Sequence, residues 1–65
     1  MKYFFGTRLP GKGTEEPLSE EQLDRIIINH WGEHALEQIK GELKNNPDVE
    51  LPLAHSASYY LVGKL

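Results

Sequence analysis

Aromatic and apolar residues gather at the two ends of the chain, and helically spaced apolar residues fill its middle. Residues 2–5 read KYFF and residues 57–62 read ASYYLV, and both runs are typical of strands. Residues 49–54 alternate poorly and contain Pro52, so they predict an edge strand at most. The stretches KYFFGTRL and SYYLVGKL have similar shapes, and we expect the two terminal strands to lie side by side in one small antiparallel sheet.

A helix is predicted to begin at residues 19–22, which read SEEQ and match a capping box. In this motif the serine hydroxyl accepts a hydrogen bond from the third helical N–H, and the glutamine side chain reaches back to the cap. The following residues recur at the spacing of one apolar helix face: Leu23, Ile26, Ile27, His30 and Trp31.

The apolar residues before and after Gly32 would lie on different sides of a single helix. On one continuous helix, Ile39 and Leu43 would point roughly 180° away from Leu23 and Ile27. Either Gly32 ends the first helix and a second begins directly after it, or one long helix lies between two apolar surfaces. Glycine costs about 1 kcal/mol inside a helix relative to alanine, so we favour a helix pair broken at Gly32.

Residues 45–48, which read NNPD, are predicted to end the helical region in a turn. The sequence therefore predicts a small α+β protein of order β-α-α-β-β, in which the terminal strands form a sheet packed on the central helix or helix pair. Its 65 residues support a single domain, residues 1–65, with a small core. There is no cysteine to cross-link the chain, so we expect a partner subunit to reinforce it and predict a homodimer.

The balance of charge narrows the classes of function. Seven basic residues stand against ten acidic ones, a net charge of −3, which disfavours a nucleic-acid-binding face. No run approaches the roughly 18 apolar residues of a membrane helix, and the N-terminus lacks the apolar region of a signal peptide. We therefore expect a cytoplasmic protein, in keeping with the absence of cysteine.

Residues 6–17 are rich in glycine and proline and are predicted to form one flexible loop. The stretch GTRLPGKGT within it is close to the phosphate-binding loop G-x-x-x-x-G-K-[ST]. It lacks the hydroxyl residue that should bind magnesium, and the predicted helix starts too late. We interpret it first as a surface loop. The alternative is a site for a small anionic ligand such as a nucleotide, bound without hydrolysis by Arg8, Gly11, Lys12, Gly13 and Thr14.

Residues 30–34, which read HWGEH, match the H-x-x-E-H zinc motif of the inverted metalloproteases. On one helix His30 and His34 would lie one turn apart, and Glu33 would act as the base. Gly32 lies inside the segment that must be helical, and nothing singles out a third ligand. A histidine on the apolar face is more typical of a core residue, so we predict no metal and no cofactor.

Residues 24–43 read DRIIINHWGEHALEQIKGEL and are similar to the first two helices of small phage Cro-type repressors. The resemblance covers roughly a third of the chain and rests on Trp31-Gly32 and Ala35-Leu36. It implies a helix-turn-helix regulator that binds DNA. The second helix carries three glutamates against two lysines and no third helix is predicted, so this remains the second alternative.

The aromatic side chains indicate a function in binding. Five of them are candidates for a protein interface: Tyr3, Phe5, Trp31, Tyr59 and Tyr60. The helices can cover one face of the sheet, and a second subunit or a target protein would cover the other unless the tyrosine hydroxyls reach water there. His55 and Ser56 form no catalytic pair, because neighbouring strand residues point to opposite faces. We therefore expect a non-enzymatic protein, of the size common in phages and mobile elements, that docks to and inhibits a larger protein.

Overall fold

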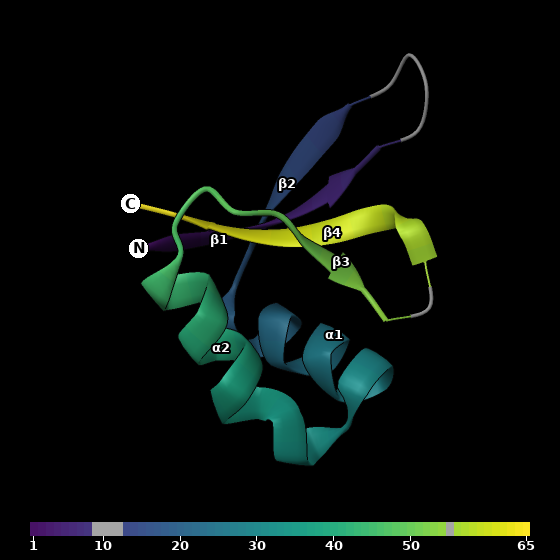
Figure 1. Ribbon diagram of the computed structural model, residues 1–65, viewed down its shortest axis with the longest axis vertical. Coiled ribbons are helices and arrows are strands. Elements are labelled where there is room, and N and C mark those ends of the chain that lie inside the picture. Colours follow the sequence, from purple (N-terminus) through teal and green to yellow (C-terminus); the bar gives the residue numbers. More distant parts are fainter. Residues whose placement is uncertain (9–12, 55) are drawn as a thin grey trace.

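The computed structural model describes residues 1–8, 13–54 and 56–65, which form an antiparallel sheet with two helices on one of its faces (Figure 1). The elements are β1 (Lys2–Thr7), β2 (Thr14–Leu18), α1 (Glu20–Trp31), the 3₁₀ turn η1 (Glu33–Ala35), α2 (Leu36–Asn45), β3 (Leu51–Leu53) and β4 (Ser56–Lys64). The predicted α+β class and the helix pair between the terminal strands are confirmed. One further strand, β2, follows β1.

The terminal strands β1 and β4 pair at the centre of the sheet, whose strand order is β2-β1-β4-β3. Their register runs from Lys2 opposite Lys64 to Thr7 opposite Tyr59. The two edge strands are short, and each contains a proline, which removes a backbone donor from an open edge. The predictions of paired terminal strands and of a weak edge strand around Pro52 are confirmed.

The structure differs from the predicted loop over residues 6–17. Strand β1 continues through Thr7, and residues 14–18, which read TEEPL, form β2. Strand β2 lies at the edge of the sheet, and the core covers only one end of it, where Leu18 packs. The strand therefore lacks the alternation of apolar and polar residues that would mark it in the sequence. Residues 9–12 of the expected loop lie outside the described residues.

Local signals set the ends of α1. The capping box is present, with the backbone N–H of Gln22 donating to Ser19 Oγ at 3.2 Å and that of Ser19 donating to Gln22 Oε1 at 3.0 Å. The helix stops at Gly32, whose φ of 95° is rarely adopted by residues with a side chain. The predicted break at Gly32 is confirmed. His30 and His34 therefore do not share one helix.

The core lies between the helix pair and the sheet. Its buried residues come from both helices, the 3₁₀ turn and two strands: Leu23, Ile27, Ala35, Ile39, Leu43, Leu53 and Leu61. An ion-pair bridge links the two helices, because Lys40 Nζ lies 2.5 Å from Asp24 Oδ1 and 3.0 Å from Glu20 Oε2. Asp24 and then Glu20 raise the pKa of Lys40 above its usual value.

The opposite face of the sheet is covered by its own side chains. The Tyr60 ring lies across Gly6, and its hydroxyl donates to Glu15 Oε2 at 2.7 Å. Lys64 Nζ donates to Glu15 Oε1 at 2.7 Å, and the Arg8 guanidinium lies 5.2 Å from the centre of the Tyr60 ring. Only 6% of Tyr60 is exposed, so this tyrosine is buried without a second subunit.

We expect the Glu15→Gln variant to be less stable than the wild type near neutral pH, with a difference that shrinks in acid. Hydrogen bonds from Lys64 and then Tyr60 lower the pKa of Glu15 below its ordinary value of 4.5. The stabilisation is therefore complete above that value and is lost as the pH falls through the lower folded pKa. Urea unfolding of both proteins at about pH 7 and about pH 2 measures the difference. An equal difference at both pH values would contradict the ionic role of Glu15.

Candidate functional site

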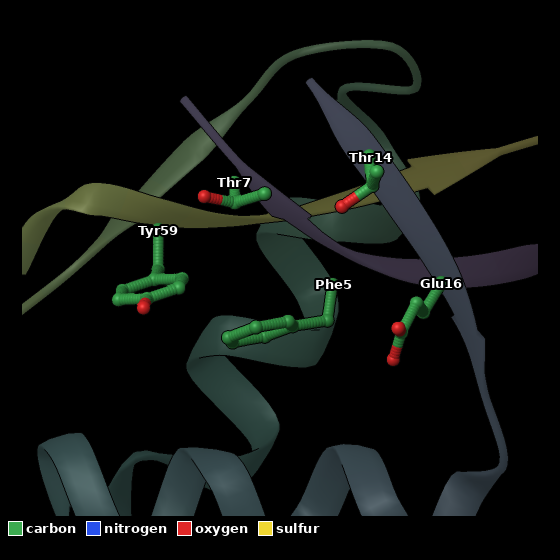
Figure 2. A pocket seen from close by; sticks show the side chains of 5 residues that line it. All are labelled: Phe5, Thr7, Thr14, Glu16 and Tyr59. Atoms are coloured by element: carbon green, nitrogen blue, oxygen red, sulfur yellow. The ribbon is translucent and has the colours of Figure 1, made fainter. Parts of the chain in front are cut away.

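A hollow opens on the helix side of the sheet, beneath the β1–β2 hairpin (Figure 2). Its volume is about 240 Å³. The side chains that line it come from three strands: Phe5, Thr7, Thr14, Glu16 and Tyr59. They share one face because the register places Phe5 opposite Glu16, and Thr7 opposite both Thr14 and Tyr59.

Two stacked aromatic rings form the floor of the hollow. The ring centres of Phe5 and Tyr59 lie 5.3 Å apart with an angle of 23° between the ring planes. Both residues are half-buried and pack against the core. The core therefore holds the pair in place while part of each ring stays open to the hollow, an arrangement typical of a preformed aromatic contact surface.

The side chain of Glu16 lies next to that of Phe5, on the side away from Tyr59 (Figure 2). Its neighbour Glu15 points to the opposite face, where Lys64 and Tyr60 bind it. Glu16 is exposed and makes no ion pair with any residue that the structure describes. Two adjacent glutamates are thus placed differently: Glu15 is part of the folded network, and Glu16 is left for solvent or a ligand.

A second hollow of about 400 Å³ continues from the first along the flank of α1. The two share Phe5 and Glu16. The second is completed by Leu18 of β2 and by four residues of α1: Gln22, Arg25, Ile26 and His30. These helix residues recur at i, i+3 and i+4 spacing and lie on one side of the helix. We call the continuous depression formed by both hollows the hairpin groove.

Two of the predicted anion-binding residues, Arg8 and Thr14, lie on opposite faces of the sheet. Arg8 pairs with Glu50 on the outer face of the sheet, whereas Thr14 lines the hollow on the helix face. Gly11 and Lys12 lie outside the described residues. A strand follows this segment and α1 begins only at Glu20, so the strand–loop–helix arrangement of a phosphate-binding loop does not form.

The two histidines of the HWGEH segment lie in different surroundings. His30 is half-buried in the last turn of α1 and lines the hairpin groove, whereas His34 is exposed in η1, beyond Gly32. Among the described residues, no group of three His, Asp or Glu side chains is placed to hold a metal ion. His55 lies outside the described residues.

The five aromatic residues predicted for an interface occupy three different environments. Phe5 and Tyr59 meet in the hollow, Tyr3 and Trp31 are half-buried against the core, and Tyr60 is buried on the outer face. The sequence-based prediction missed Thr7 and Glu16, as well as the flank of α1. Recognition of TEEPL as an edge strand would have placed Thr14 and Glu16 on one face, but only the strand register shows that this is the face of Phe5.

Comparison with known protein families, curated proteins and solved structures finds no match for this chain. No helix in the described part of the chain is long and apolar enough to cross a membrane.

Proposed function

We propose that this protein is a non-enzymatic binding protein that docks to a larger protein through the hairpin groove and inhibits it. The stacked Phe5–Tyr59 pair carries the proposal, because the core fixes it and the chain leaves it partly open. Aromatic residues held in this way are the usual anchors of protein interfaces. The hollow above them, about 240 Å³, is smaller than most small-molecule pockets but suits a protruding side chain.

The edges of the sheet are poorly suited to pairing with a strand of the partner, which favours docking in the hairpin groove. A partner strand needs a run of free backbone donors and acceptors along an open edge. The edge strand β2 carries two glutamates and Pro17, and β3 has three residues with Pro52 and a bulge. Both edges therefore carry features that oppose pairing with another strand.

The helix pair gives little support to the DNA-binding alternative. Helix α2 buries Ile39 and Leu43 against the core, so its outer side would have to face the nucleic acid. Of the two lysines on that helix, Lys40 is held by acidic residues of α1. This leaves few cations for phosphate contacts, which supply most of the affinity in such complexes.

We expect the Thr14→Trp variant to lose the partner. Thr14 is exposed at the start of β2, so a tryptophan there would fill the hollow without entering the core. Wild-type and variant proteins are immobilised, and the proteins that each retains from an extract of the source organism are compared. The retained amount of one specific protein should fall about tenfold or more.

Gln38→Trp is the matched control, because Gln38 is exposed on α2, away from the groove. This variant should retain the partner as the wild type does, and urea unfolding should show both variants folded. Equal retention by Thr14→Trp and the wild type would overturn the proposal. Light scattering of the same samples gives their mass and tests the homodimer predicted from the sequence.

A further inference from the structure

We infer that the hollow above Phe5 and Tyr59 takes a basic side chain of the partner, and that arginine fits it best. This inference rests on the proposed function and names the chemistry that the groove recognises. The hollow combines two aromatic side chains with the carboxylate of Glu16 (Figure 2). Aromatic faces attract cations, and a planar guanidinium can stack on a ring while it donates hydrogen bonds to a carboxylate.

The outer face of the sheet shows the same combination twice, each time with its cation in place. The Arg8 guanidinium lies 5.2 Å from the centre of the Tyr60 ring and pairs with Glu50. Lys64 Nζ lies 5.6 Å from the centre of the Phe4 ring and pairs with Glu15. In both cases a ring, a carboxylate and a cation come together within one chain.

The helix face has the rings and the carboxylate without a cation from the described residues. Arg25 lines the neighbouring hollow but pairs with Glu21, at 3.5 Å. Glu16 is the only charged residue among the five that line the first hollow. An arginine of the partner would supply the missing cation. The ring, carboxylate and cation would then come together in the hollow as they do on the outer face.

The charge of the hollow also decides against an anionic ligand at this position. A phosphate placed above Phe5 would face the Glu16 carboxylate, and the two like charges would repel each other. A guanidinium has five N–H donors, and the Thr14 hydroxyl offers a further acceptor beside Glu16. The net charge of −3 favours the approach of basic partners as well.

The test is a titration of the ¹⁵N-labelled protein with the capped peptide acetyl-Gly-Arg-Gly-amide, followed by amide chemical shifts. The same peptide with citrulline, which has the shape of arginine without its charge, is the first comparison, and a phenylalanine peptide is the second. We expect saturable shifts at Phe5, Glu16 and Tyr59 with the arginine peptide. The citrulline peptide should bind about tenfold more weakly.

Three variants test which features of the hollow are responsible for binding of the arginine peptide. Glu16→Gln should weaken binding of the arginine peptide about tenfold and leave the unfolding free energy unchanged, and Thr14→Trp should abolish binding. Glu15→Gln is the matched control, because the neighbouring carboxylate faces away from the hollow, and it should bind the peptide as the wild type does.

The inference would be overturned by the absence of a saturable shift with the arginine peptide, or by equal binding of the citrulline or phenylalanine peptide by the wild type. Unchanged binding by Glu16→Gln would also overturn it. The proposed function would still stand in these cases if Thr14→Trp loses the partner protein. Retention of that protein by Thr14→Trp would overturn the proposed function itself, so the two failures can be told apart.

Discussion

The Leu61→Ala variant is expected to lose about 3 kcal/mol of unfolding free energy. Leu61 is completely buried in the central strand β4, where it lies between Phe5 of β1 and Leu51 of β3 in the sheet register. Removal of its side chain takes apolar atoms out of the core and leaves a cavity beneath the helices. A domain of this size has a total stability of roughly 3–10 kcal/mol, so the loss would remove between about a third and all of it.

Urea unfolding followed by the fluorescence of Trp31 measures this loss, because Trp31 is the single tryptophan and packs against the core. Val49→Ala is the matched control: Val49 is 58% exposed, and its replacement should change the unfolding free energy by less than about 0.5 kcal/mol. A loss below about 1 kcal/mol for Leu61→Ala would mean that the helices do not pack over β4 as described.

Features set by local signals could be predicted from the sequence. The capping box spans four residues, and Gly32 ends α1 through its own backbone conformation, so both are visible in the order of the residues. The terminal strands could be predicted because their aromatic residues are too dense for loops. These signals sufficed for the α+β class and for the position of the helix pair.

Strand β2 and the site beside it could not be predicted, because they depend on strand register. Glu15 and Glu16 are identical in type and adjacent in sequence, and only the pairing of Phe5 with Glu16 assigns them to opposite faces. The same holds for Tyr59 and Tyr60. Tyr59 lies in the hollow, whereas the hydrogen bond to Glu15 holds Tyr60 on the other face and raises its pKa to about 12.

A Gly6→Ala variant tests this assignment of faces, and we expect it to lose about 2 kcal/mol of unfolding free energy. The added Cβ would lie 2.1 Å from Tyr60 Cζ, far inside van der Waals contact. The ring cannot simply move aside, because its hydroxyl binds Glu15 and the Arg8 guanidinium covers it. Gly13→Ala is the matched control in the same hairpin, where an added Cβ meets nothing within 4 Å, and it should be close to neutral.

The Tyr60→Ala background shows whether the ring is the cause of the loss. Gly6 lies within β1 and its φ is not positive, so alanine fits its backbone and only the ring opposes the extra methyl group. In Tyr60→Ala the space over Gly6 is open, and Gly6→Ala should there cost less than about 0.5 kcal/mol. Urea unfolding of the four proteins gives the coupling energy between the two positions. Equal losses in both backgrounds would show that Tyr60 does not lie across Gly6, and would remove the basis for placing Tyr59 and Glu16 on the binding face.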